Sequence, residues 1–248
     1  MRENRCEAVV LAVLDYGEAD KIITFFTREH GKIKCIARNA KNSRRRFGGV
    51  LELFARLRLQ IVLREGLSRL QGADVVTIFP HIREDLSKIG YAGYACELSD
   101  RMLPEAQANV RLYRLLVSYL EQLDSFPCSA DDRRFFEVNL LNVTGYRPAL
   151  EICPNCGAEL VSAPLLRYLP TQSGISCGCC RQAGREISPL TVSLLNAALQ
   201  SGRFGAIRFP GTLLDEAGGI LDSIIASHLN RPLHSLSFLQ EALLVEGY

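Results

Sequence analysis

The chain has 248 residues, of which 48% are hydrophobic and 23% are charged, and its formal net charge is +2. This length suits one large domain or, as the better expectation, two smaller ones, and the apolar content is enough for packed cores. The longest apolar runs are too short to cross a bilayer, and the N-terminus lacks an apolar signal segment. Nine cysteines, an odd number, favour reduced thiols in the cytoplasm over a disulfide scaffold.

The positive charge is concentrated in the first third of the chain. Residues 1–80 contain 15 Lys and Arg against 9 Asp and Glu, a net charge of +6, whereas the remainder carries −4. A basic segment joined to a mildly acidic body suggests an anionic partner, with nucleic acid as the first candidate and a membrane surface as the second.

Alternation of polar and apolar residues predicts a small antiparallel β-barrel over residues 1–80. Lys32 and Lys34 alternate with Ile33 and Cys35, as in a half-exposed strand. No segment here is a helix long enough to connect parallel strands, so a small barrel is the best fit. The predicted strands are residues 6–14, 22–27, 32–38, 51–63 and 67–76.

From about residue 81 the hydrophobic period changes to that of helices, which predicts a helical domain over residues 81–248. A cysteine-rich insertion at 151–186 interrupts it, and the predicted fold class is α+β. Asp131 is the predicted N-cap of the third helix, and Ser188 with Pro189 marks the start of the fourth. The predicted helices are residues 85–103, 110–123, 131–145, 189–202, 220–230 and 237–245.

Two cysteine pairs in this insertion predict a structural zinc site. Cys153 and Cys156 form one C-x₂-C knuckle, and Cys177 and Cys180 form a second. Four thiolates at this spacing match tetrahedral Zn²⁺ and leave no position open for a catalytic water. A redox pair or unliganded thiols is the alternative, and Cys179 is a possible replacement for one ligand of the second knuckle.

The densest positive charge lies in residues 38–49, between two predicted strands, and this segment is called the basic loop below. Its cations are placed to meet successive phosphates, and nearby phenylalanines are candidates for stacking on unpaired bases. The simpler interpretation is a solvated loop with phenylalanines that belong to the barrel core. The candidate nucleic-acid-binding residues are Lys32, Lys34, Arg38, Lys41, Arg44, Arg45, Arg46 and Phe47.

No catalytic pattern stands out in the sequence. The four histidines are scattered, and there is neither a nucleophile elbow nor a phosphate-binding glycine loop. We therefore expect a binding protein that is not an enzyme.

The order of these parts resembles the bacterial DNA-repair protein family RecO. The similarity covers essentially the whole chain, and it rests on the joint order of several segments. These are Tyr16-Gly17-Glu18-Ala19-Asp20-Lys21, Phe25 to Lys32 followed by Ala37-Arg38, Phe135 to Leu141, and Gly145-Tyr146-Arg147-Pro148 leading into Cys153.

The resemblance implies an OB-fold at the N-terminus, a helical domain carrying the zinc module, and no enzymatic activity. It implies binding to single- and double-stranded DNA, annealing of complementary strands, pairing with RecR, and help in loading RecA onto DNA coated by single-strand-binding protein (SSB). It also implies contact with the acidic tail of SSB. Candidate cations for that contact are Arg101, Arg111, Arg114, Arg133 and Arg134.

Two other classes of function remain open at this point. One is a zinc-ribbon RNA-binding or transcription accessory protein that uses the same barrel. The other is a zinc enzyme, which is disfavoured because four cysteines fill the metal's coordination positions. A protein of the first kind need not anneal DNA, so an annealing assay separates it from a recombination mediator.

Overall fold

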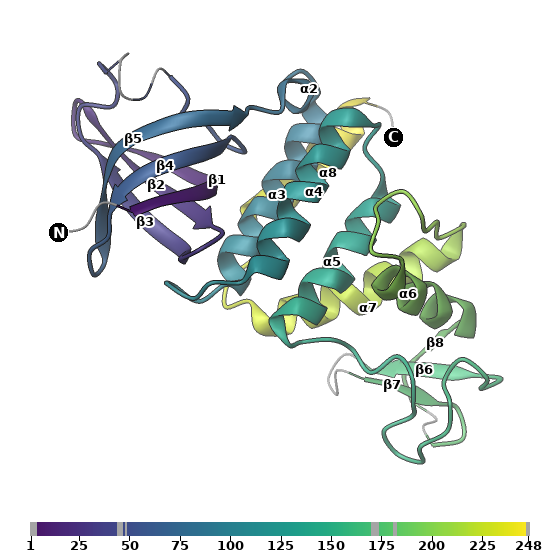
Figure 1. The fold of residues 1–248 in the computed structure, drawn as a ribbon. Coiled ribbons are helices and arrows are strands. Elements are labelled where there is room, and N and C mark those ends of the chain that lie inside the picture. Colours follow the sequence, from purple (N-terminus) through teal and green to yellow (C-terminus); the bar gives the residue numbers. More distant parts are fainter. Residues whose placement is uncertain (1–3, 44–46, 48, 170–173, 181–182, 247–248) are drawn as a thin grey trace. The chain divides into compact units, whose positions relative to one another are not determined.

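A computed structural model of the chain describes residues 4–43, 47, 49–169, 174–180 and 183–246 (Figure 1). By internal contacts the chain divides into two compact units. Unit 1 comprises Met1–Pro127 with Leu233–Tyr248, and unit 2 comprises Cys128–Pro232. Each unit is described by itself.

Unit 1 begins with five strands that close into a barrel, as the alternation predicts. The strands follow the order β1-β2-β3-β5-β4 around the barrel, and β4 returns to β1. Only the β3–β5 pair is parallel. This topology agrees with a five-stranded OB-type barrel, so the predicted fold class is confirmed. The strands are β1 (Asn4–Tyr16), β2 (Asp20–Thr27), β3 (Gly31–Ala37), β4 (Arg56–Val62) and β5 (Leu67–Thr77).

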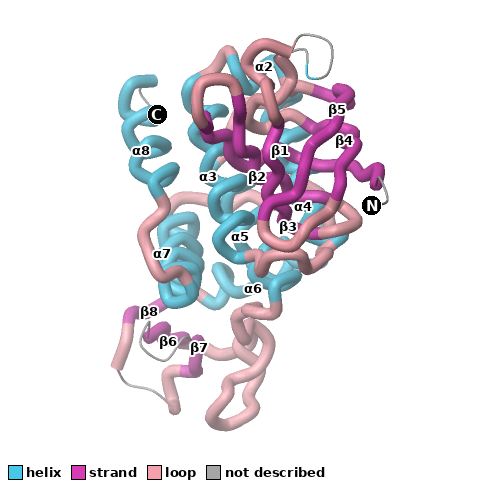
Figure 2. The backbone as a smooth tube through the Cα atoms, turned by 90° about the vertical axis from the view of Figure 1, so that its left-hand side faces the viewer, coloured by secondary structure: helices cyan, strands magenta, loops and turns pink. Residues whose placement is uncertain are grey.

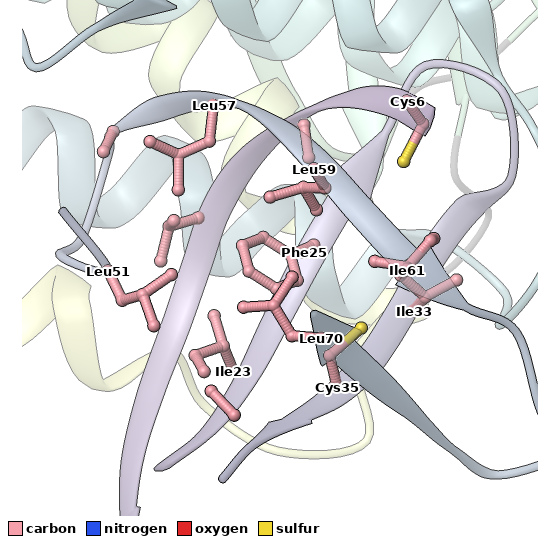
Figure 3. Close-up of a cluster of buried hydrophobic side chains, with 14 of the residues drawn as sticks. Cys6, Ile23, Phe25, Ile33, Cys35, Leu51, Leu57, Leu59, Ile61 and Leu70 are labelled. Atoms are coloured by element: carbon pink, nitrogen blue, oxygen red, sulfur yellow. The ribbon is translucent and has the colours of Figure 1, made fainter. Parts of the chain in front are cut away.

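Alternate residues of every strand fill the interior of the barrel. Ile23, Phe25 and Cys35 are fully buried there, as Figure 3 shows. Burial raises the pKa of the Cys35 thiol, and likewise that of Cys6, to about 12. These two thiols therefore behave as small apolar core groups rather than as nucleophiles.

The fourth strand is shorter than the sequence predicts. The alternation suggests a strand from residue 51, but β4 begins at Arg56, because residues 51–55 form a turn against a bulge in β1. Phe54 takes a left-handed backbone conformation, with φ 72°, and its N–H donates to the Val10 carbonyl at 3.0 Å. The local pattern cannot reveal this turn, because it is held by a distant strand.

Four helices complete the part of unit 1 that the structure describes. Asp85 caps α3 by accepting from the Lys88 N–H, and Asn109 caps α4 in the same way. A Cβ on Gly90 of α3 would lie 2.9 Å from Leu239 Cδ1 of α8, so this glycine permits the close helix contact. The helices are α2 (Pro80–Arg83), α3 (Leu86–Met102), α4 (Val110–Ser125) and α8 (His234–Glu246).

Glu97 on α3 holds the start of α8. Its carboxylate accepts from the Ser235 N–H at 2.8 Å and from the His234 N–H at 3.3 Å. Burial acts to raise the pKa of Glu97, but these hydrogen bonds and Arg101 bring it below the usual 4.5. The folded-state pKa is depressed, so this stabilisation is present at neutral pH and is lost as the pH falls through that pKa.

We expect Glu97→Ala to lower the free energy of unfolding by about 1 kcal/mol, the usual effect of losing a helix cap. Urea unfolding at neutral pH measures the loss, and the difference in unfolding free energy from wild type should narrow as the pH falls through the lowered pKa of Glu97. Glu241→Ala, on the exposed surface of α8, is the matched control and should change little. Equal effects of the two substitutions would show that Glu97 does not cap the helix.

Unit 2 contains three helices and a small sheet. Ser129, rather than the predicted Asp131, caps α5, while Ser188 and Gly202 bound α6 as the sequence predicts. The last helix begins two turns earlier than expected, because Gly218 does not interrupt it. A Cβ on Gly218 would lie 2.6 Å from Arg134 Nη2, so this glycine makes room for the arginine. The helices are α5 (Ala130–Thr144), α6 (Pro189–Ser201) and α7 (Thr212–His228).

The cysteine-rich insertion folds as three short strands with loops on either side, labelled at the bottom of Figure 2. The strand order is β7-β6-β8, and both pairs are antiparallel. Leu166 and Ile175 are buried in a small core of this module. The strands are β6 (Leu166–Leu169), β7 (Gly174–Cys177) and β8 (Arg185–Ile187).

The change from strands to helices occurs near residue 80, where the sequence predicts it, between β5 and α2. The compact units, however, do not divide there, because α2, α3, α4 and α8 group with the barrel. None of the described helices is long and apolar enough to cross a membrane.

Candidate metal centre and nucleic-acid interface

The first cysteine knuckle is a tight turn held by backbone hydrogen bonds. The Cys153 N–H donates to the Ala158 carbonyl at 2.7 Å, and the Gly157 N–H donates to the Cys153 carbonyl at 2.9 Å. Gly157 has φ 73°, a conformation that glycine adopts without strain. The turn thus brings the sulfur atoms of Cys153 and Cys156 close together.

The second knuckle begins at the end of β7. The Gly178 N–H donates to the Leu165 carbonyl at 2.7 Å, and the Cys180 N–H donates to the Cys177 carbonyl at 3.1 Å. A Cβ on Gly178 would lie 2.8 Å from Leu165 Cδ2, so glycine is required for this contact. The sheet therefore fixes Cys177, and the following turn places Cys180.

The two knuckles bring four sulfur atoms together, those of Cys153, Cys156, Cys177 and Cys180. All lie within 4.8 Å of one another, and the Cys156 and Cys177 sulfurs are 3.6 Å apart. Zn–S bonds of about 2.3 Å in a tetrahedron require sulfurs about 3.8 Å apart, so the donor set fits such a metal. Cys179 is exposed and does not belong to this group.

The thiols of this group differ in their affinity for protons. Burial acts to raise the pKa of Cys153, but backbone N–H groups of Cys177, Asn155 and Cys156 donate to its sulfur and lower the pKa to about 6. Hydrogen bonding to Cys156 raises the pKa of Cys180 to about 12. Thiolates are the metal-binding form, so metal uptake here would release protons and weaken as the pH falls.

The base of the basic loop is tied to the turn between β1 and β2. The Asn39 N–H donates to the Asp20 carboxylate at 2.7 Å, and Lys41 Nζ lies 3.2 Å from the Asp15 carboxylate. Arg38 is exposed where the loop leaves β3. The predicted contact residues Arg44, Arg45 and Arg46 lie outside the residues that the structure describes.

The predicted role of Phe47 needs a correction. Its ring is 2% exposed and packs in the barrel core, so it cannot stack on a base without leaving that core. Phe25, Phe26 and Phe54 are buried as well. Buried rings are not available for stacking, so the barrel-core interpretation holds for Phe25 and Phe47, while Phe26 and Phe54 are buried outside that core.

Lys32 and Lys34 both meet carboxylates of unit 1. Lys32 Nζ donates to the Asp100 carbonyl at 2.7 Å and lies 3.3 Å from the carboxylate, and the lysine side chain is 13% exposed. Its predicted phosphate contact is therefore corrected to a structural ion pair with α3. Lys34, half exposed, pairs with Glu105 at 3.1 Å and is still accessible to a phosphate.

Glu105 competes with a phosphate for Lys34. The hydrogen bond from Lys34 holds the pKa of Glu105 below its usual value, so the carboxylate is charged at neutral pH. We expect Glu105→Gln to raise DNA affinity by up to about fivefold at low salt, because the surface ion pair no longer has to break. Fluorescence anisotropy with a labelled oligonucleotide measures the change.

Glu65→Gln is the control, because Glu65 lines the same hollow of about 690 Å³ as Lys34 and Glu105. If both substitutions raise the affinity equally, the effect reflects overall charge. The Lys34–Glu105 pair would then have no specific part in it.

Two of the cations proposed for an acidic tail are engaged inside unit 2. Arg133 and Arg134 both bond the fully buried Glu137, at 2.8 and 2.7 Å, and both reach Asp222. They connect α5 to α7. The hypothesis that these two arginines meet the acidic tail is therefore corrected to a structural role inside unit 2. Arg111 and Arg114 lie exposed on α4.

The sequence interpretation also missed cations on the barrel wall. Arg5, Arg58 and Arg69 are exposed on β1, β4 and β5. Alternation along β5 places Arg69 on the side opposite the buried Leu70, so the signal was present. A search restricted to the densest charge run overlooks residues that only the sheet register brings together.

Comparison with known proteins agrees with this architecture. Residues 1–79 match the family model described as recombination protein O N terminal, and residues 83–237 match recombination protein O C terminal. The chain is 53% identical over 241 residues to DNA repair protein RecO of Geobacter sulfurreducens, covering 97% of this chain and 99% of that protein. It is 50% identical to the Geobacter metallireducens protein of the same name, with 97% and 98% covered. The chain therefore belongs to the RecO family of DNA repair proteins.

Proposed function

We propose that this protein is a non-enzymatic recombination mediator, which binds single- and double-stranded DNA and anneals complementary strands. The observation that carries the proposal is a closed five-stranded barrel with a basic loop, in a chain of a DNA-repair family. Small barrels of this type bind nucleic acid along a basic surface, and the phosphates supply most of the affinity. It would act in the cytoplasm, associated with the nucleoid.

In this proposal the four-cysteine group holds one structural Zn²⁺ per chain. Cys153, Cys156, Cys177 and Cys180 are the ligands, and four thiolates complete a tetrahedral site. The metal would supply folding energy to the module, and no coordination position would be left for a substrate. This arrangement supports a binding role over a zinc enzyme.

The proposed partners are RecR, SSB and, indirectly, RecA, which the protein would help to load onto SSB-coated DNA. A protein that binds DNA and also holds SSB raises the effective concentration of each partner at the binding site of the other. The exposed Arg111 and Arg114 on α4 are the remaining candidates to meet the acidic SSB tail.

Annealing of bare complementary strands tests the core of the proposal. We expect the protein to accelerate pairing of two complementary DNA oligonucleotides, with affinity falling steeply as salt rises. A zinc-ribbon RNA-binding protein would instead prefer RNA and leave DNA annealing unchanged, and that result would refute the mediator.

A further inference from the structure

The four-sulfur group of unit 2 has an inner and an outer half. Cys153 and Cys177 are 1% and 4% exposed, whereas Cys156 and Cys180 are exposed to solvent. Each C-x₂-C knuckle therefore contributes one buried cysteine and, three residues later, one that solvent reaches. A small oxidant in the surrounding water meets the outer half first.

The inner half is held by the fold of the module. Cys177 ends β7, where it pairs with Leu166 of the neighbouring strand β6. The Cys153 sulfur accepts hydrogen bonds from the backbone N–H groups of Cys177, Asn155 and Cys156. Such bonds stabilise the negative charge of a thiolate and make its sulfur a weaker nucleophile. The inner sulfurs are therefore shielded from an oxidant and, at Cys153, less reactive towards it.

The outer half lies on turns rather than on the sheet. Cys156 belongs to the turn at residues 154–156, and Cys180 belongs to the turn at 178–180 that follows β7. Their sulfurs lie within 4.8 Å of each other. A disulfide has an S–S distance of about 2.05 Å, so the two turns have to share a movement of about 3 Å at most.

Cys179, the exposed neighbour of Cys180, is the competing partner for a disulfide, but its position excludes it. Consecutive Cα atoms are about 3.8 Å apart, which is below the roughly 4.4–6.8 Å that an unstrained disulfide requires. Cys179 also lies apart from the four-sulfur group. Oxidation should therefore join the two knuckles rather than two neighbours in the chain.

We propose that Cys156 and Cys180 form a reversible oxidation site through which hydrogen peroxide releases the metal of this module. The inference rests on the metal site of the proposed function and adds its regulation. One outer sulfur attacks the peroxide, the O–O bond breaks, and a sulfenic acid forms while the departing hydroxide is protonated to water. The second sulfur attacks the sulfenic sulfur, the S–O bond breaks, and the S–S bond forms with release of a second hydroxide, also protonated to water. Two thiolates lose two electrons, and one peroxide becomes two water molecules.

The disulfide would both open the metal site and preserve its parts. It removes two of four ligands, and the thiolates of Cys153 and Cys177 alone cannot close a tetrahedral site. The module then loses the folding energy that metal binding supplies. The same bond keeps the two knuckles tied together, so a thiol reductant regenerates four thiolates within reach of one another. The barrel belongs to the other compact unit, so binding of bare DNA should not change.

The test treats the zinc-loaded full-length protein with hydrogen peroxide and follows free zinc with a chromogenic chelator. We expect about one zinc per chain to appear in step with one disulfide between Cys156 and Cys180, identified by alkylation and peptide mapping. Dithiothreitol with added zinc should restore the metal content and the resistance of residues 149–187 to protease. Anisotropy with a bare oligonucleotide should give the same affinity before and after oxidation.

Cys179→Ser is the matched control, because it removes the exposed thiol that lies outside the four-sulfur group. It should release zinc at the wild-type rate, and slow release would mean that Cys179 is the reacting thiol, which overturns the proposal. A disulfide that includes Cys153 or Cys177, or zinc loss at the same rate without peroxide, would overturn it too. Zinc that stays bound under peroxide would refute the oxidation site and leave the metal site standing. A wild type without zinc before oxidation would refute the metal site itself, and the oxidation site with it.

Discussion

Replacement of Cys153 by serine is expected to abolish stoichiometric metal binding and to unfold the module around β6, β7 and β8. Three remaining thiolates cannot close a tetrahedral site, and binding free energies of about 10–16 kcal/mol for structural zinc are folding free energy. The module's own core is small, with Leu160, Leu166 and Ile175 among its few buried side chains. Zinc content by elemental analysis and limited proteolysis of residues 149–187 measure the effect.

Cys179→Ser is the matched control for this prediction. Cys179 neighbours a ligand, is exposed, and stands apart from the four-sulfur group, so its loss should leave metal and module intact. Unit 1 should stay folded in both variants. A metal-free wild type whose module resists proteolysis would contradict the structural metal site, as would equal behaviour of the two serine variants.

Joint replacement of Arg44, Arg45 and Arg46 by alanine is expected to give the largest loss of DNA binding. Phosphate contacts carry no sequence information, so affinity for any sequence should fall by a similar factor. The slope of log K against log salt should flatten by about 2–3 units, at roughly 0.7–0.9 per lost contact. Titrations between 50 and 200 mM salt, on single strands and duplexes, measure both quantities.

Arg203→Ala/Arg231→Ala removes two exposed charges from unit 2 and is the control for overall charge. If net charge alone governed binding, this variant would lose about two-thirds of the slope change seen for the triple variant. We expect it to lose almost none. An unchanged slope in the triple variant would mean that the arginines are only solvated.

Local patterns in the sequence predicted most of the elements. Alternation located the five strands, and residues such as Ser188, Pro189 and Gly202 marked the limits of a helix, because these signals act through neighbouring residues. The cysteine spacing likewise predicted the four-sulfur group, since knuckle geometry is encoded within each C-x₂-C pair. No distant contact was needed for either inference.

Features that depend on distant contacts were not predictable. The turn at residues 51–55 is held by Val10, and α7 runs through Gly218, which leaves room for Arg134 of α5. Local patterns likewise could not show that the helices α2, α3, α4 and α8 form one compact unit with the barrel. The C-terminal helix α8 packs on α3, and Tyr113 of α4 packs against Phe26 on the outside of the barrel. A fragment of residues 1–80 would expose that surface, so the barrel alone is a poor test protein.

For the candidate site too, local signals were predictable and contacts between distant residues were not. Charge density identified the basic loop, but it could not show that Lys32 pairs with Asp100 or that Phe47 belongs to the core.

Annealing of complementary strands that are both coated with SSB tests the mediator most directly. A protein of this kind should pair coated strands well above the rate without protein, and the alanine variant of Arg44, Arg45 and Arg46 should lose that acceleration. Bare-strand binding measured in the same buffer provides the reference. If wild type binds bare DNA normally yet leaves coated strands unpaired, the account of this protein as a recombination mediator is contradicted.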